Sequence, residues 1–194
     1  MTIRKGEPWG AADGPAPSAH LSDDVSLAAH VALDRGAVVS VAGGDLHRTL
    51  GLATTPRHDP LWFPMDLGFV SIDNGPEHPF VAHAVLRSRT WLGAGAVIMN
   101  AAWIGDRYLG PRAHPNDGLL DITVGALPPR QLMIAARRAK TGMHLPHPAL
   151  AVRRVETWSH TFERPRFLWL DGRRSGHGRS VACRVEADWF TLVG

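Results

Sequence analysis

The chain has 194 residues, of which 44% are hydrophobic and 20% charged, with a formal net charge of +3 and a sequence pI near 9.7. This composition excludes a chain that is disordered along its whole length, because it can bury a substantial hydrophobic core. Nucleic-acid binding is not expected, since the arginines are scattered and no basic stripe alternates with aromatic residues. The mildly basic balance is compatible with weak attraction to phosphates, nucleotides or an anionic membrane surface.

Cys183 is the only cysteine, so the chain forms neither an internal disulfide nor a cysteine-based metal cluster. The first residues, MTIRKGEPWG, contain no apolar signal core. No apolar run approaches the roughly 18 residues that a membrane-spanning helix needs. We therefore expect a cytoplasmic protein in a reducing compartment.

The beginning of the chain predicts an arm followed by a helix and a strand. Residues 1–20 are rich in proline, glycine and alanine, which favours a mobile arm with Trp9 as its candidate anchor. A helix is predicted over 22–35, because Ser22 is a good N-cap and two aspartates follow it in the first turn. The apolar run 37–42 then predicts a short buried strand.

The rest of the chain is dominated by strand patterns. Short segments of alternating apolar and polar residues, separated by turn signals, favour a β-sandwich or barrel. Asn74-Gly75 and Asp171-Gly172 are turn pairs typical of hairpins. Strands are expected over 66–73, 79–90, 95–102, 119–125, 150–157, 166–170, 180–187 and 188–193.

A second helix is predicted over 128–144, with prolines at its start and Gly142 near its end. Its apolar face is expected to cover the sheet, and its basic residues lie mostly off that face. They form a solvated surface in the simpler interpretation and contact lipid headgroups in the alternative. These basic residues are Arg130, Arg137, Arg138 and Lys140.

Two short motifs carry only weak signals. Gly43-Gly44-Asp45 follows a strand, where backbone amides can cradle a phosphate, but no phosphate-loop lysine comes after it. His144 and His147 are separated by proline, which excludes a shared helical face. A turn is therefore preferred to a metal site at these histidines.

The stretch HPNDGLLDI, residues 114–122, supports two interpretations. Asn116-Asp117-Gly118 is a turn before a strand, and turn chemistry predicts such residues without any function. Carboxylate and backbone oxygens in a tight turn also suit a hard cation such as Mg²⁺ or Ca²⁺, here with Asp117 and Asp121.

Several segments, in chain order, resemble the diacylglycerol kinase and sphingosine kinase catalytic family, in its bacterial lipid-kinase branch. The resemblance covers about residues 37–194, and its most specific piece is PRAHPNDGLLD. The matching segments are GGDLHRTLG (43–51), Asp66-Leu67-Gly68, Met99-Asn100 through Gly110, PRAHPNDGLLD (111–121) and LDGRRSG (170–176).

The resemblance implies a mainly β fold, a β-sandwich like the second domain of bacterial lipid kinases, with a helix-strand appendage at the N-terminus. In the family this domain carries much of the lipid side of the site. The NDGLLD loop is implied to hold a structural Mg²⁺ through the carboxylate of Asp117 and the backbone oxygens of His114 and Leu119.

The sequence departs from the family pattern in three places. The family's α/β domain, with its Gly-Gly-Asp-Gly-Thr nucleotide motif, needs far more chain than residues 1–36 provide. The Gly-Thr of the later motif is not retained at 42–44. The glutamate of the Asp-Gly-Glu hairpin, which the family is thought to use as general base, is Arg173 here. A guanidinium stays charged and cannot accept a proton, so ATP-dependent transfer is not expected from this chain alone.

The basic hairpin suggests a binding role instead. Arg173 and Arg174, with Arg48 and Asn100, are candidates for binding a phosphate or a lipid headgroup. An exposed charged hairpin without a ligand is the alternative.

We predict a lipid-kinase-like β-sandwich domain over 52–194, after a helix-strand remnant over 21–51, that binds a lipid, a phosphate or a protein partner without catalysis. The first alternative is one half of a split ATP-dependent lipid kinase, whose nucleotide domain comes from another chain; pairing with a second copy at a sheet edge is a further option. The other alternative is a metal-assisted phosphohydrolase around Asp117, with Asp106, Asp121 and His114 as its remaining ligands.

Overall fold

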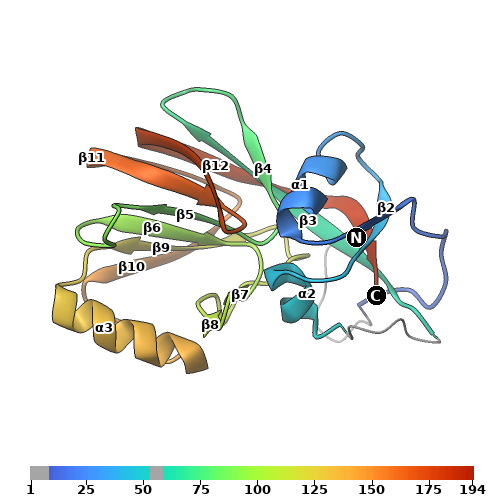
Figure 1. Cartoon of the computed structure of the whole chain (residues 1–194), viewed down its shortest axis with the longest axis horizontal. Coiled ribbons are helices and arrows are strands. Elements are labelled where there is room, and N and C mark those ends of the chain that lie inside the picture. Colours follow the sequence, from blue (N-terminus) through green and yellow to red (C-terminus); the bar gives the residue numbers. More distant parts are fainter. Residues whose placement is uncertain (1–8, 53–58) are drawn as a thin grey trace.

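The computed structural model describes residues 9–52 and 59–194. Ten strands join into one large, strongly bent sheet, with a separate two-stranded ribbon beside it. Two short helices, α1 and α2, lie at one end of the molecule, and the longer helix α3 lies at the other (Figure 1). The predicted fold class, a mainly β and sandwich-like domain, is confirmed.

The N-terminal elements form a small β-α-β unit. Strand β1 (Ala19–Leu21) pairs in parallel with β2 (Val38–Val41), and α1 (Asp24–Val31) connects them. β2 in turn pairs in parallel with the end of the last strand. Helix α1 is shorter than the predicted helix over 22–35, and its N-cap is Asp23 rather than Ser22.

The described part of the predicted arm contacts the body of the domain. The Trp9 ring lies 4.9 Å from the ring of Phe63 and 4.5 Å from that of His114, as centroid distances. The Trp62 indole donates a hydrogen bond of 2.8 Å to the carbonyl of Pro15. Residues 1–8, on which the prediction of a mobile arm also rests, lie outside the described residues.

Helix α2 (Asp45–Leu50) was not predicted. It begins directly after the Gly43-Gly44 pair and ends at Gly51, which adopts a left-handed conformation with φ of 63°. Six residues give less than two turns, too few for a periodic pattern. The helix is stabilised instead by the side chain of Asp24, which accepts hydrogen bonds from the first backbone amides of α2.

The remaining strands build the sheet and the ribbon. In the sheet, the neighbours run β1-β2-β12-β11-β5-β6-β9-β10, while β3 pairs with β12 and β4. The strands are β3 (Trp62–Ile72), β4 (His78–Phe80), β5 (His83–Arg87), β6 (Gly95–Met99), β9 (Leu120–Gly125), β10 (Leu150–Val155), β11 (Thr157–Leu170) and β12 (Arg173–Val193), with β7 (Trp103–Ile104) and β8 (Arg107–Tyr108) in the ribbon.

The longest strand replaces two predicted ones. β12 runs through both 180–187 and 188–193, with a register irregularity against β3 between Glu186 and Phe190. It is joined to β11 by the predicted Asp171-Gly172 turn, where both residues have positive φ. Such a turn matches the right-handed twist of the two strands, so this hairpin is confirmed.

Two hydrophobic clusters hold the sheet together. One packs α1 against β2, β3 and the end of β12, with Leu27, Val31 and Leu67 fully buried. The other lies among β5, β6, β9, β11 and β12, around Phe80 and Phe162. Helix α3 (Pro129–Arg138) belongs to neither cluster and has no buried residue.

Candidate functional site

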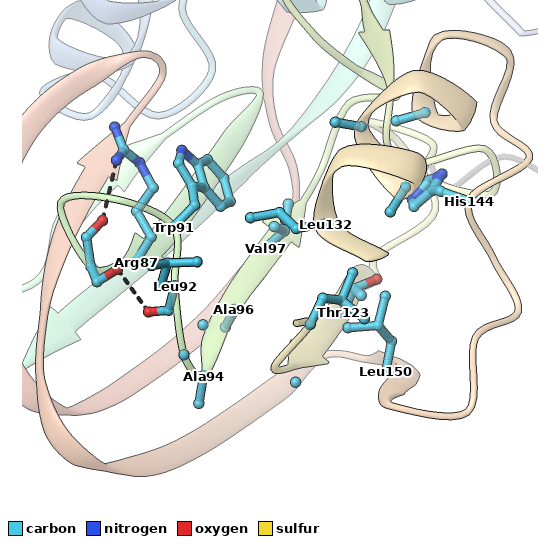
Figure 2. Close-up of a pocket in the computed structure, with 18 of the residues that line it drawn as sticks. Arg87, Trp91, Leu92, Ala94, Ala96, Val97, Thr123, Leu132, His144 and Leu150 are labelled. Carbon is cyan, nitrogen blue, oxygen red and sulfur yellow. Dashed lines mark hydrogen bonds between the residues drawn. The ribbon is translucent and has the colours of Figure 1, made fainter. Parts of the chain in front are cut away.

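An apolar groove of about 430 Å³ lies between α3 and the sheet. Its floor is formed by β6 and β9, one wall by the loop 88–94, and the opposite wall by α3 (Figure 2). Residues that line it include Trp91, Leu92, Ala96, Val97, Thr123, Leu127, Leu132, Ala135, Ala136, Ala139, His144 and Leu150.

The groove exists because small side chains face one another across it. Leu132, Ala135, Ala136 and Ala139 follow helical spacing and line the groove from α3 and the turn after it. The opposite floor includes glycine and alanine, among them Ala96. Alanine side chains cannot span the distance between a helix and a sheet, so α3 lines the groove without filling it.

Two arginines, Arg87 and Arg107, line the groove, and Arg87 lies directly before the loop 88–94. The guanidinium of Arg87 donates hydrogen bonds to the carbonyls of Ser88 and Arg89, at 3.2 and 3.1 Å. It stacks over the ring of Trp91 at 4.9 Å, and burial lowers its pKa. None of the lining residues is acidic. The site therefore combines an apolar interior with positive charge.

A buried polar cluster lies at the other end of the molecule, around α2. The carboxylate of Asp24 accepts hydrogen bonds from the backbone amides of Asp45, at 2.5 Å, and Leu46, and so caps α2 from α1. Burial raises the pKa of Asp24 to about 7, and the charge of Asp171 adds to the shift. A side chain at Gly44 would collide with this carboxylate, which accounts for the glycine.

His83 joins this cluster to the sheet. Its Nε2 lies 2.9 Å from Oδ2 of Asp45, and the other oxygen of Asp45 accepts from the amide of Gly105 at 2.8 Å. Burial by itself lowers the pKa of His83, but the Asp45 hydrogen bond and the charge of Asp171 outweigh it, so the pKa is raised.

The turn of the β11-β12 hairpin is anchored by Asp171. Its buried carboxylate accepts hydrogen bonds from the backbone amides of Val81, Ala82 and His83, at 2.9 to 3.0 Å. Burial raises the pKa of Asp171. The carboxylate is thus committed to holding the hairpin against the link between β4 and β5.

The NDGLLD loop is fixed by two separate sets of contacts. The buried carboxylate of Asp66 accepts from the amides of Gly118, at 2.7 Å, and Asp188, at 3.0 Å, and burial raises its pKa to about 6. Asp117 accepts from the amide of Leu119 at 3.0 Å and forms an ion pair with Arg154.

The predicted metal ligands are only partly suited to a cation in this arrangement. Arg154 also lies 3.5 Å from the carboxylate of Asp121, so one guanidinium serves both acids. Among the described residues, no group of three or more His, Cys, Asp or Glu could hold a metal ion. The ring of His114 packs on Trp9, and burial lowers the pKa of His114. Mg²⁺ at Asp117, His114 and Leu119 stays a prediction, and it requires Arg154 to release Asp117.

The four predicted phosphate- or lipid-binding residues are not brought into one pocket. Arg48 stacks over the ring of Trp103 at 4.0 Å and donates to the carbonyl of Gly105. Asn100 has no exposed area, and its amide donates to the carbonyls of Val81 and Asp66. An interior side chain offers no surface to a ligand.

The other two predicted residues lie on the hairpin. Arg173 and Arg174 are exposed at the start of β12, and the guanidinium of Arg174 stacks over the ring of Phe167 at 4.1 Å. Neither lines the groove.

The sequence does not predict the groove. Its signals were the aromatic loop TWLGAG, residues 90–95, and the alanine spacing of α3. Each pattern is local, and only the tertiary fold places the two walls opposite each other.

The comparisons with known proteins agree with this fold. Residues 77–188, more than half of the chain, match the family described as the YegS C-terminal NAD kinase beta sandwich-like domain. The chain belongs to this family. No curated protein matches it.

Solved structures support the same architecture. One is a proposed diacylglycerol kinase from Bacillus anthracis strain Sterne, with a TM-score of 0.61 and 14% identity, covering 84% of this chain and 70% of that one. A second, a diacylglycerol kinase from the same strain, has a TM-score of 0.59 and 14% identity, covering 84% and 68%. At this identity the likeness shows the fold alone. Across the described ranges, no helix is long and apolar enough to cross a membrane.

Proposed function

We propose that this lipid-kinase-type domain binds a lipid in the groove beside α3 and does not itself transfer phosphate. The observation that carries the proposal is the groove, about 430 Å³ in volume, lined by apolar side chains and by arginine but by no acid. An apolar cavity with a few polar and basic groups in its lining suits a molecule with an acyl chain and an anionic or polar head.

The hairpin supports the absence of catalysis. Arg173 occupies the place where lipid kinases are expected to carry an acidic base, and a guanidinium does not take up a proton. The neighbouring carboxylate, Asp171, is buried and accepts three backbone hydrogen bonds. Neither group is therefore placed to activate a lipid hydroxyl.

The Gly-Gly-Asp turn also argues against a nucleotide at this position. The backbone amides at the start of α2, those of Asp45 and Leu46, already donate to the carboxylate of Asp24. An anion bound there would have to displace this internal one. The turn is therefore a helix cap supplied by the chain itself.

A split lipid kinase is the second candidate. It is favoured by strand β1, a three-residue strand at the edge of the sheet that runs parallel to β2. An edge of this kind can accept a further strand from another chain carrying a nucleotide domain. In that case the groove would still bind the lipid, and the partner would have to supply the base.

The test is titration with a fluorescent fatty acid below its micelle concentration. Ala136→Trp fills the groove and should reduce binding at least tenfold. Ala29→Trp, the same change at an exposed position on α1, should bind like the wild type. Unchanged binding in folded Ala136→Trp would overturn the proposal.

A further inference from the structure

We infer that the face formed by α3 and the loop 88–94 docks on an anionic lipid bilayer, with the mouth of the groove toward the membrane. The proposed function concerns a lipid inside the groove, whereas this inference concerns the surface around it. It rests on charge, on exposed apolar side chains and on the conformation of one tryptophan.

The segments that build this face contain no acid at all. Between Glu77 and Asp106 there is no aspartate or glutamate, and there is none between Asp121 and Glu156. The basic residues of these two segments are Arg87, Arg89, Arg130, Arg137, Arg138, Lys140, Arg153 and Arg154. Such a one-sided distribution complements the negative potential of an anionic leaflet.

The arginines of α3 are available to a partner. Arg154 is engaged by Asp117, and Lys140 by Asp106 at 3.0 Å. Within 9–52 and 59–194, Arg130, Arg137 and Arg138 make no ion pair, and all three are exposed. Their guanidinium groups are therefore the ones free to meet lipid phosphates.

Large apolar side chains are exposed on α3 and on the loop. Met133, which lines the groove, is 54% exposed, and Ile134 on α3 and Met143 just beyond it, which do not line it, are 42% and 71% exposed. On the loop, Trp91 is 40% exposed and Leu92 46%. Apolar and aromatic side chains interspersed with arginine are typical of surfaces that insert into the headgroup region.

Trp91 is held in an unusual conformation. Its φ is 63°, a left-handed value that is rare for a bulky residue and costs free energy. The loop is closed by the Ser88 hydroxyl, which donates to the carbonyl of Leu92 at 2.8 Å, and by Arg87 under the indole. Figure 2 shows Trp91 and Leu92 on the wall that faces α3. The fold thus maintains strain at the point that presents the tryptophan.

The test is sedimentation of the full chain with vesicles of phosphatidylcholine, with and without phosphatidylglycerol, at low and high salt. Binding should require phosphatidylglycerol and weaken with salt. Arg130→Gln/Arg138→Gln should weaken it on the order of tenfold, since each basic residue near such a surface contributes appreciably. Arg35→Gln/Arg179→Gln is the control that removes the same charge from two exposed arginines that lie neither on α3 nor on the loop; Arg35 is paired with Glu186 at 4.0 Å.

Trp91→Gly provides a second, uncharged probe. Glycine adopts the left-handed φ of this position without a steric penalty, so the variant should fold, and it should weaken vesicle binding without changing the salt dependence. The inference would be overturned if the chain bound neutral vesicles as well as anionic ones. It would also be overturned if both double arginine variants lost vesicle binding equally, or if the chain preferred a DNA duplex to anionic vesicles. Loss of vesicle binding with intact fatty-acid binding would contradict this inference alone; the reverse result would contradict the proposed function alone.

Discussion

Helices α1 and α3 lie at opposite ends of the same sheet and are built in opposite ways (Figure 1). α1 buries Leu27 and Val31 completely, and its N-terminus has a reciprocal capping box formed by Asp23 and Ser26. α3 buries no residue and has no side-chain cap. A helix that packs closely stabilises the fold, whereas one that stands off a sheet leaves room for a ligand. The close packing therefore lies at the α1 end of the sheet, and the open groove lies at the α3 end.

The largest expected effect separates the two helices by stability. Leu27→Ala should lower the free energy of unfolding by about 2–5 kcal/mol, because it opens a cavity in a closed core. Leu132→Ala, the same change on α3, should cost about 1 kcal/mol or less, because its surroundings are already open. Urea unfolding measures both free energies, and equal losses of stability would mean that α1 and α3 are packed alike.

The second prediction concerns pH at the α1-α2 end. Asp24 keeps its proton up to about pH 7 in the folded state but releases it near about pH 4 when unfolded. The folded state therefore binds more protons in this window, and stability falls as pH rises from about 4 to about 7. Asp24→Asn should flatten the dependence of Tm on pH over that range.

A control is needed because several other groups act in the same direction. Asp66 has a pKa raised to about 6, and the pKa values of His83, Asp117, Asp121 and Asp171 are also raised. The informative quantity is hence the difference between wild type and Asp24→Asn at each pH. Asp34→Asn, an exposed change on the loop after α1, should leave the profile as it is. If Tm depended on pH in the same way in the wild type and in Asp24→Asn, the raised pKa would not belong to Asp24.

The third prediction tests Mg²⁺ at the loop between the two ends. If Mg²⁺ binds Asp117, it should raise Tm, and Asp117→Ala should abolish that shift. Arg154→Gln should enlarge the shift, because it frees the carboxylate from its ion pair. The measurement is thermal unfolding with and without MgCl₂. A wild-type shift that persists in Asp117→Ala would eliminate the site.

The smallest effect comes from filling the groove. Ala136→Leu should raise the free energy of unfolding by about 0.5–1 kcal/mol, because it adds apolar contact between α3 and the sheet. The same variant should weaken fatty-acid binding. A destabilised variant would mean that α3 is already packed as closely as α1.

The mainly β fold was predictable because its signals are local. Alternating residues predicted β5 and part of β12, other strand-like segments predicted most of β3 and β9, and the Asp171-Gly172 pair predicted the hairpin. What was missed depends on distant contacts: α2 is capped by Asp24, twenty-one positions before Asp45. Strand β1 has three residues and is defined by pairing with β2. No local pattern contains either contact.

The site was predictable only in part. The motif order led to the NDGLLD loop, but the partner of Asp117 is Arg154, thirty-seven positions later and in another strand. The pattern of α3 predicted an apolar face covering the sheet. It could not predict the gap, which depends on how small side chains on α3 and β6 face one another after folding.

The most direct test of the central claim is phosphate transfer from labelled ATP with Mg²⁺. The acceptors are diacylglycerol, sphingoid and glycerolipid substrates, with an active lipid kinase as positive control. Since Arg173 cannot act as a base, we predict no transfer above background by the chain alone, even with lipid bound in the groove. Phosphate transfer that persists after the protein is repurified, and that is lost in the Ala136→Trp variant, would contradict the absence of catalysis.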